Sequence, residues 1–573
     1  MANSNAIRSG IGGIVGVYAV TAVALALIVV SLAGTVVGSF APAGEIFGAT
    51  LSNFVRVAGD ARVPGIVGRT IILGIGTVAV AMAVALPLAW VLGPTDFRWK
   101  TALFAALAAK LAIPGFITAM SYVWLFNPSS GLVNQMLGRT SVDGAPAFDI
   151  YQMGWICLLQ GLVSVPGAVF MILPAIRNLD ASLEEAALTS GVPRAHVFRS
   201  IVVPLLAPAT FAVAVFYFII AVEMFDFVAI IGFADGGDVL VLRIYHALVE
   251  TGGLPEYGIA GVFGLILFAI CIGAILAYVR LLRDARRFAV VGGKRRMMSP
   301  VRLGRWHGVA TALVLVWVGL TIIMPVITLV WVTLTPFFQP PSAAAWAAIS
   351  LTGFIDGFSY LAKPAMNTAG VMIGAMIVAM SFSVAVTWVV TRSRTRLARW
   401  ADAVVFLAPA VPTVVSATAF QVLGIAIYEW LPLYGTLWIM IAAMGTRMVT
   451  YCSRTLNGAA MQLSPELEEA AWVSGLSQWA AFRHVFVPLM APAIFYAALM
   501  VGMLAARDLT MPLIMSGGRT PLISTLVFDL QTNGEYNSAA AVALYMIVVL
   551  VALALFARRL TGLGEPGLEP ARR

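Results

Sequence analysis

The chain has 573 residues, of which 61% are apolar and only 11% are Asp, Glu, Lys or Arg, and its mean hydropathy is +0.96. A soluble protein carries roughly a quarter charged residues, so this composition excludes a soluble enzyme, a disordered chain and a disulfide scaffold, and it favours a polytopic membrane protein. The net charge of +9 must be interpreted from its placement, because membrane proteins use Lys and Arg to set orientation. The cysteines and histidines show no disulfide or zinc spacing, and metal ligands stay unassigned.

Twelve apolar segments follow one another along the chain, each able to cross a hydrocarbon layer of about 30 Å as a helix of about 20 residues. They lie at about 12–37, 69–92, 101–126, 152–176, 200–233, 257–280, 307–335, 366–391, 402–426, 434–460, 488–516 and 537–557. The first segment is too long for the apolar core of a signal peptide, so we interpret it as a retained helix. The predicted fold class is all-α, a polytopic membrane protein with about twelve transmembrane helices.

The basic residues lie on alternate loops. With the N-terminus in the cytoplasm, the segment 280–305 falls inside with nine basic residues and one acid, and the loop 391–399 and the C-terminal arginines fall on the same side. The outer loops carry acids and few bases. This positive-inside pattern predicts cytoplasmic N- and C-termini. A patch for anionic lipid or nucleic acid at 280–305 is the alternative, but the pattern favours topology, with the lipid bilayer and no nucleic acid as partner.

The sequence contains an internal repeat. The 27 residues from Leu183 to Ala209 match those from Leu467 to Ala493 without a gap, at an offset of 284 and with 15 identities. Three pairs upstream are 298 residues apart: Thr70 with Thr368, Trp90 with Trp388, and Pro114 with Pro412. The 14 extra residues of the first half therefore lie between Pro114 and Leu183, and we place them in the external loop 128–150.

The repeat divides the chain into two six-span halves. The predicted boundaries are a first transmembrane half at 1–283, a basic cytoplasmic linker at 284–306 and a second transmembrane half at 307–573. Six spans return the chain to its starting side, so both halves have the same orientation. Parallel repeats of this kind are related by an axis along the membrane normal, with the substrate route at their interface. This symmetry supports transport but does not choose the energy source.

The repeated segment sits in a cytoplasmic loop and has the sequence of a short helix. Asp180 and Ser464 suit the N-cap, glutamates fill the first turns, and Gly191 and Gly475 supply a left-handed stop. A helix of about ten residues is unstable alone in water. We therefore expect it to lie against a partner surface.

The same segment resembles the signature of ABC-transporter inner-membrane permeases: E-A-A, three residues, Gly, nine residues, then I-x-L-P. The matching residues are Glu185, Ala186, Ala187, Gly191 and 201–204 in the first half, and Glu469, Ala470, Ala471, Gly475 and 485–488 in the second. Valine replaces leucine in both copies, and Val485 replaces isoleucine in the second. The resemblance implies the fold of a type I ABC importer permease.

The resemblance also implies partners. Each signature helix would dock into a cleft of a cytoplasmic ATPase subunit, with Glu185 and Glu469 facing its basic groups and the two glycines permitting the turn. Two such helices imply two ATPase subunits, which would bind ATP and Mg. This chain lacks G-x-x-x-x-G-K-[ST], so we expect a transport subunit that binds no cofactor and is not an enzyme. Importers of this kind receive substrate from a periplasmic binding protein and lie in the bacterial inner membrane.

Fused two-half permeases of this kind resemble the iron(III)-type group, which also contains importers of thiamine and 2-aminoethylphosphonate. The similarity includes the proline-containing turns at 113–116 and 411–414, which we interpret as kinks that line a cavity. Iron(III) is the family default, and the other two substrates stay open. A twelve-span secondary transporter is a further alternative. An intramembrane enzyme would need a nucleophile, base or metal-ligand set that the sequence does not show.

Five ionisable residues fall within predicted spans, where charges are costly and need a reason. They are Lys110, Glu223, Asp226, Arg507 and Asp508. At the offset of 284, Glu223 aligns with Arg507, so we expect these two to approach each other between the halves and form part of a gate or substrate route. Glu223 and Asp226 could instead line a cation path, or the charges could be solvated near the outer boundary. Lys110 could snorkel, attract an anion or pair with an acid.

Overall fold

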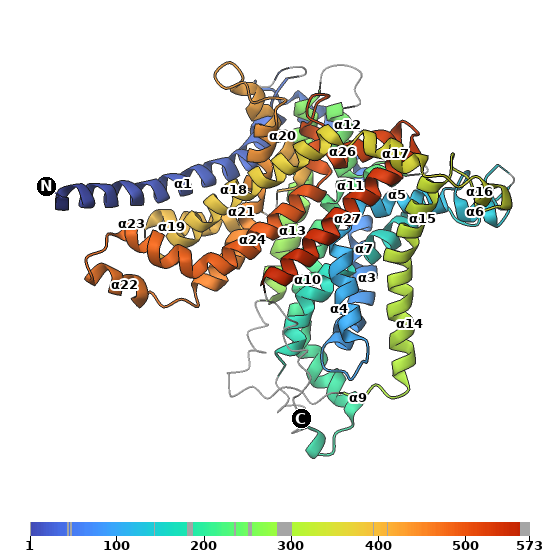
Figure 1. The fold of residues 1–573 in the computed structure, drawn as a ribbon, viewed down its shortest axis with the longest axis horizontal. Helices are drawn as coiled ribbons and strands as arrows, with labels where there is room; N and C mark the ends of the chain where they lie inside the picture. Colours follow the sequence, from blue (N-terminus) through green and yellow to red (C-terminus); the bar gives the residue numbers. More distant parts are fainter. Residues whose placement is uncertain are drawn as a thin grey trace.

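The computed structural model describes residues 2–42, 45, 48–142, 144–179, 187–233, 237–249, 255–282, 301–393, 395–408 and 411–561. In this part of the chain the elements are helices, and strand-type pairing is limited to one isolated bridge between Thr95 and Val301. The prediction of an all-α polytopic membrane protein is confirmed. Figure 1 shows the helices close together at the top and spread below into two arms, one of which reaches α22 and the other α9.

The helices of the first half are α1 (Ala2–Ser39), α2 (Ser52–Gly59), α3 (Val63–Leu92), α4 (Lys100–Ala112), α5 (Gly115–Phe126), α6 (Leu132–Met136), α7 (Met153–Arg177), α9 (Arg194–Val197), the π-helical turn η1 (Phe198–Val202), α10 (Val203–Glu223), α11 (Phe225–Ile231), α12 (Leu240–Val249) and α13 (Tyr257–Leu282). Those of the second half are α14 (Trp306–Val318), the π-helical turn η3 (Gly319–Ile323), α15 (Met324–Leu334), α16 (Ala343–Ala347), α17 (Thr352–Ser359), α18 (Ala362–Arg392), α19 (Arg396–Leu407), α20 (Thr413–Ala426), α21 (Leu437–Ala460), α22 (Glu466–Val473), α23 (Gln478–Ala481), the π-helical turn η5 (Phe482–Phe486), α24 (Val487–Arg507), α25 (Thr510–Met515), α26 (Ile523–Thr532) and α27 (Tyr536–Thr561).

Some of the twelve predicted spans form single long helices in the structure and others do not. Among the described residues nine helices are long and apolar enough to cross a membrane, and α4 with α5, bent by 93°, makes a tenth candidate. The predicted spans at 402–426 and 434–460 hold α19, α20 and α21, which are not in that set. The reason is local, because α20 has only 14 residues and α21 carries Arg447 and Arg454.

Prolines break the third predicted span of each half. Pro114 and Pro412 lie directly before α5 and α20, with φ near −58° and ψ near 145°. Ile113 before the first of them is also extended, at φ −77° and ψ 121°, because a residue that precedes proline is disfavoured in the helical region. The predicted kinks are therefore present. Each break leaves carbonyl groups of the preceding turn without a partner in the helix.

The internal repeat is visible in the structure. Helices α7 and α21 begin 284 residues apart, as do the turns η1 and η5 and the helices α10 and α24, whereas α5 and α20 follow prolines 298 residues apart. The offset therefore changes between Gly115 and Met153, in the loop that contains α6. This is where the extra residues of the first half were predicted.

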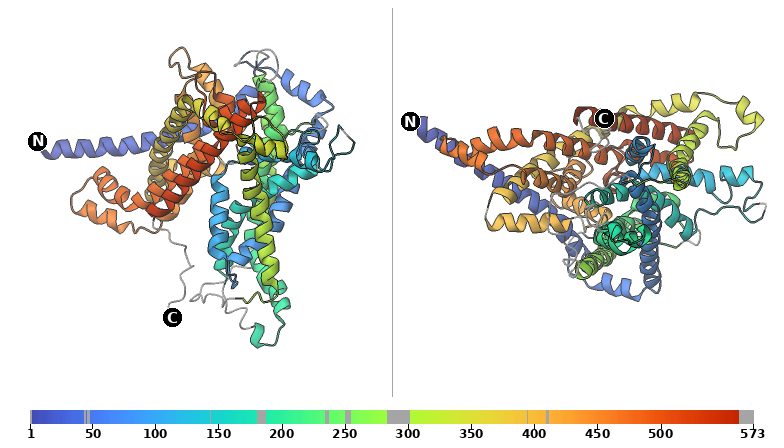
Figure 2. Two further views of the ribbon diagram at one scale, coloured as in Figure 1. Left: turned by 45° about the vertical axis from the view of Figure 1, so that its right-hand side comes forward. Right: turned by 90° about the horizontal axis from the view of Figure 1, so that it is seen from below.

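The first span of each half packs on the other half. Helix α1 lies along α18, α19 and α20, while α14 and α15 lie against α3 and α5. Figure 2 shows this packing of each first span on the opposite half from two further directions. Hydrogen bonds join each of these helices to the other half. Ser31 and Ser416 share a hydrogen bond of 3.1 Å, and the Trp317 indole donates to the Leu162 carbonyl at 3.1 Å. The two sequence halves are therefore interlocked.

A glycine allows the close approach of α13 and α1. A Cβ atom on Gly261 would lie 2.7 Å from the backbone nitrogen of Ser39, so the helix backbones are nearly in contact there. Gly273 on the same helix has open space at its Cβ position. Small residues at one point of a membrane helix commonly mark such a contact. Gly261 is therefore a packing residue and Gly273 is not.

Candidate functional site

The signature helix of the second half is α22. The Ser464 hydroxyl accepts a hydrogen bond from the Glu466 backbone N–H at 3.3 Å, and Pro465 already has helical φ and ψ. At its other end, Gly475 has φ +89° and its N–H donates to the Trp472 carbonyl at 2.9 Å. The predicted start and the predicted left-handed stop are both present.

The first copy is described only in part. Residues 180–186, which include Asp180, Glu185 and Ala186, lie outside the described residues. Residues 187–189 are helical, and Gly191 follows with φ +80° and an N–H that donates to the Leu188 carbonyl at 3.0 Å. The two glycines thus end their helices in the same way.

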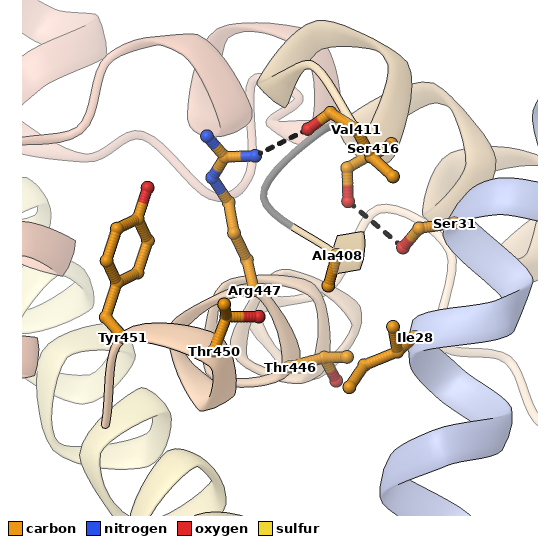
Figure 3. A pocket seen from close by; sticks show the side chains of 9 residues that line it. All are labelled: Ile28, Ser31, Ala408, Val411, Ser416, Thr446, Arg447, Thr450 and Tyr451. Atoms are coloured by element: carbon orange, nitrogen blue, oxygen red, sulfur yellow. Dashed lines mark hydrogen bonds between the residues drawn. The ribbon is translucent and has the colours of Figure 1, made fainter. Parts of the chain in front are cut away.

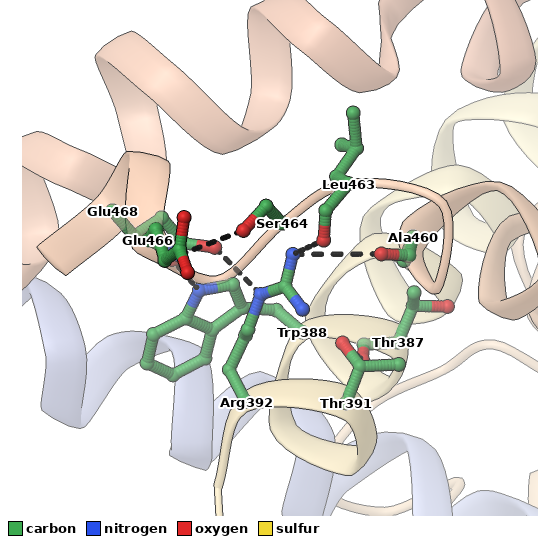
Figure 4. Close-up of polar contacts among 9 residues, drawn as sticks. All are labelled: Thr387, Trp388, Thr391, Arg392, Ala460, Leu463, Ser464, Glu466 and Glu468. Carbon is green, nitrogen blue, oxygen red and sulfur yellow. Dashed lines mark hydrogen bonds and ion pairs between the residues drawn. The ribbon is translucent and has the colours of Figure 1, made fainter.

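Two adjacent glutamates of α22 have different environments. Glu469, the glutamate of the signature, is exposed, as is Ala470, whereas Ala471 is buried. Glu468 is only 3% exposed and forms an ion pair with Arg392 of α18 at 2.7 Å, as Figure 4 shows. The signature in the sequence does not include Glu468. At the offset of 284, Glu468 is repeated as Glu184. The signature residues are repeated in the same way, so this repetition was the one sign in the sequence that Glu468 has a function.

The outer face of α22 is apolar as well as acidic. Leu467 is 47% exposed, and Val473 is 90% exposed. An amphipathic helix of eight residues with uncovered apolar side chains is not stable by itself. The expectation of a partner surface is consistent with this exposure.

A second group of charged residues lies between the halves. The Glu223 carboxylate, at the end of α10, forms an ion pair with Arg447 of α21 at 3.6 Å. Arg447 also donates to the Val411 carbonyl at 3.2 Å, directly before Pro412, as Figure 3 shows. The Arg447 guanidinium therefore pairs with an acid of the first half and also donates to a backbone carbonyl at the break in the span of the second half.

Arg507 has the corresponding position at the break in the first half. It donates to the Leu111 carbonyl, near the end of α4, and it interacts electrostatically with Asp226 and Asp508. Lys110 is buried beside it and donates from Nζ to the Thr118 hydroxyl at 2.6 Å. An arginine thus binds a carbonyl near the proline break of each half, and acids of both halves lie beside these arginines.

The expected pairing of Glu223 with Arg507 is wrong. Glu223 pairs with Arg447, whereas Arg507 donates to the Leu111 carbonyl and interacts electrostatically with Asp226 and Asp508. The physical reason is the break in α4–α5, which offers Arg507 an unpaired carbonyl nearby. Arg447 was missed because its repeat counterpart, Val163, is apolar and the repeat gave no signal for it.

Lys110, Asp226 and Asp508 also belong to this charged group. Lys110 does not snorkel, since its ammonium group is buried against Thr118. Asp226 and Asp508 lie within the group, and the Asp508 carboxylate accepts the Met511 backbone N–H at 3.3 Å. Over the described residues, no three His, Cys, Asp or Glu side chains are arranged to hold a metal ion. The group combines the ion pair of Glu223 and Arg447 with two backbone carbonyl groups that accept bonds from Arg447 and Arg507.

A small polar pocket adjoins Arg447, between α1, α20 and α21. Figure 3 shows the hydroxyl groups that surround it, with Ser31 and Ser416 bonded to each other and Tyr451 on the opposite side. The Thr446 hydroxyl is buried and has no hydrogen-bond partner among the described residues. Polar side chains that face a pocket within a membrane bundle are typical of a solute or water route.

Comparison with known proteins agrees with this arrangement. A family model described as "Binding-protein-dependent transport system inner membrane component" matches residues 85–286 and again 377–569. An Fe(3+)-transport system permease protein of Haemophilus influenzae is 21% identical over 87% of this chain and 90% of its own length. A ferric transport system permease protein of Actinobacillus pleuropneumoniae is 25% identical over 90% of this chain and 73% of its own length. An sn-glycerol-3-phosphate transport system permease protein of Brucella abortus is 29% identical over 34% of this chain and 68% of its own length. The chain therefore belongs to the family of binding-protein-dependent transport system inner membrane components, as a multi-pass permease of an ABC importer.

Proposed function

We propose that this permease imports iron(III) across the bacterial inner membrane, by alternating access driven by two separate ATPase subunits. The observation that carries the substrate is the pair of relatives that align with most of this chain and most of their own length. Both are named as permeases for Fe(3+) or ferric transport. The relative named for glycerol 3-phosphate aligns with only one third of this chain.

The geometry of α22 supports the energy source. Its exposed Glu469 and its uncovered apolar residues Leu467 and Val473 provide the charge and the surface that a docking cleft on an ATPase would need. The matching stop at Gly191 supports a second docking helix, and hence a second ATPase subunit.

The charged group between the halves supports a route there. It contains three acids, Glu223, Asp226 and Asp508, and three bases, Lys110, Arg447 and Arg507. Since these side chains come from both halves, a relative movement of the halves separates or joins them. The first half contributes a net charge of −1 to this group and the second half a net charge of +1, so attraction between the halves favours the closed route.

Reconstitution tests the proposal. The permease is placed in liposomes with its ATPase and a periplasmic binding protein loaded with radioactive iron(III), and uptake is followed with ATP and with a non-hydrolysable analogue. We expect uptake of iron(III) that requires ATP hydrolysis and the binding protein. Uptake of thiamine or 2-aminoethylphosphonate in place of iron would refute the substrate, and uptake without an ATPase would refute the energy source.

The proposed orientation can be tested separately by cysteine labelling. Cys157, Cys271 and Cys452 are all buried, so the background is low. Val142 lies in the loop proposed to be periplasmic and Val473 lies on α22, and their side chains are 81% and 90% exposed. In intact spheroplasts a membrane-impermeant maleimide should label Val142→Cys but not Val473→Cys. The reverse pattern would refute cytoplasmic termini.

A further inference from the structure

Glu468 is fixed to α18 by both of its carboxylate oxygens. Oε1 accepts a bond from Arg392 Nε at 2.7 Å, and Oε2 accepts one from the Trp388 indole at 3.0 Å, as Figure 4 shows. Both distances are within the range of good hydrogen bonds, and one of them is charge-assisted. We call these three residues, Glu468, Arg392 and Trp388, the α22 anchor.

Arg392 extends the anchor to two more elements. Its Nη2 donates to the Leu463 carbonyl at 3.1 Å and to the Ala460 carbonyl at 3.5 Å, at the end of α21 and in the loop that follows. Its guanidinium lies 5.7 Å from the centre of the Phe486 ring, in the turn η5 that begins the span of α24. One guanidinium therefore touches α22, the end of α21 and the start of α24.

The aromatic side chains around the anchor are packed in series. Trp388 meets Phe482 edge to face at 5.7 Å, and Phe482 stacks on Phe486 at 5.9 Å. Further along, Gly502 of α24 lies against Met376 of α18, so the two helices stay in contact over much of their length. Helix α24 then ends at Arg507, in the charged group between the halves.

The chemistry of the anchor favours a rigid joint over a surface contact. The Arg392 side chain is 10% exposed and that of Glu468 is 4% exposed, so both partners are largely shielded from water. Breaking a buried and fully hydrogen-bonded ion pair is far more costly than breaking an exposed one. Glu469, the next residue, points about 100° away around the helix and is free to meet a partner protein.

We propose that Glu468, Arg392 and Trp388 are positioning residues, which hold α22 on α18 and α24 so that a movement imposed on α22 reaches the charged group between the halves. The proposal rests on the proposed function of α22 as the ATPase-docking helix. It gives the two adjacent glutamates separate tasks. Glu469 faces the ATPase, and Glu468 transmits the movement to the membrane helices.

The anchor in this form belongs to the second half. At the offset of 298, Trp90 takes the place of Trp388, and it meets Phe198 edge to face at 5.2 Å, as Trp388 meets Phe482. Arg392 corresponds to Pro94, which cannot supply a guanidinium. The arginine at this repeat position is therefore a property of α18 alone.

The test compares three variants of the full chain, reconstituted with the ATPase and the binding protein. Glu468→Gln removes the negative charge of the anchor, Trp388→Phe removes the indole N–H and part of the ring system while keeping an aromatic ring near Phe482, and Glu469→Gln is the matched control on the exposed face. Three quantities are measured for each: co-purification of the ATPase, the rate of ATP hydrolysis and the rate of solute uptake.

We expect Glu468→Gln and Trp388→Phe to retain the ATPase and its hydrolysis while uptake per ATP falls about tenfold. We expect Glu469→Gln to lose ATPase association instead. Wild-type uptake per ATP in Trp388→Phe would overturn the proposal, and so would a loss of ATPase association in Glu468→Gln equal to that of Glu469→Gln. The unmodified chain is measured first. If it associates with no ATPase, the proposed function is refuted, and the variants are compared only if it does associate.

Discussion

The ion pair between Glu223 and Arg447 gives a quantitative prediction about the contact between the halves. The perturbation is Arg447→Met, which leaves the Glu223 carboxylate buried without its counter-charge. The two side chains are 10% and 14% exposed and the N–O distance is 3.6 Å. Two unit charges at that distance attract by about 5 kcal/mol at an effective dielectric constant of about 20.

The net effect is smaller than this attraction, because burying the two charges has its own cost. Removal of one partner from a buried pair typically destabilises a protein by about 3–5 kcal/mol. The distance is long for a charged hydrogen bond, and Glu223 Oε2 has no partner among the described residues. We therefore expect the lower end for Arg447→Met, about 3 kcal/mol. Glu223→Gln leaves Arg447 bonded to the Val411 carbonyl, so its penalty should be about 1–2 kcal/mol.

The assay is a double-mutant cycle on the free energy of unfolding, measured by denaturant titration in one detergent or bicelle. We expect the double variant to be more stable than the sum of the single penalties predicts, with a coupling energy of about 2 kcal/mol. Asp402→Asn with Arg454→Met provides the matched control, since that pair is 3.8 Å apart but about half exposed, and its coupling should be below about 1 kcal/mol. Penalties for Glu223 and Arg447 that add within about 0.5 kcal/mol would refute the reasoning.

Three further predictions concern single positions. Gly475→Ala places a Cβ at φ +89° and should destabilise the end of α22 by about 1–2 kcal/mol, which is measured as faster hydrogen exchange of the α22 amides. The control, Gly458→Ala, lies inside a helix with open space around it and should be neutral or stabilising, so equal exchange rates in the two variants would contradict this prediction. Gly261→Ala should destabilise the contact of α13 with α1 by about 1–3 kcal/mol and Gly273→Ala should not, and equal free energies of unfolding would argue against close packing there. Lys110→Met removes a buried charge that lies beside the like charge of Arg507, so it should leave the free energy of unfolding unchanged or raise it by about 1 kcal/mol. We expect solute uptake to fall in this variant, and unchanged uptake would show that Lys110 does not line the route.

Much of the fold could be predicted from the sequence because membrane helices leave strong local signals. Length, hydropathy and the inner arginines predicted a helical bundle, and the breaks at Pro114 and Pro412 followed from proline chemistry. The spans that contain α20 and α21 were predicted as long apolar helices, but α20 is short and α21 carries two arginines, Arg447 and Arg454. Hydropathy averaged over a segment does not show where a helix begins or that a buried arginine has partners.

The candidate site divides in the same way. Local sequence predicted the start of α22 and the stops at Gly191 and Gly475, because caps depend on neighbouring residues alone. The repeat predicted which residues are equivalent, but it paired Glu223 with the wrong arginine, since equivalence by symmetry does not require contact. Only the tertiary structure decided that Arg447 pairs with Glu223. It also separated Glu468 from Glu469, because burial depends on which helix packs on each face, and helices far apart in sequence determine that packing.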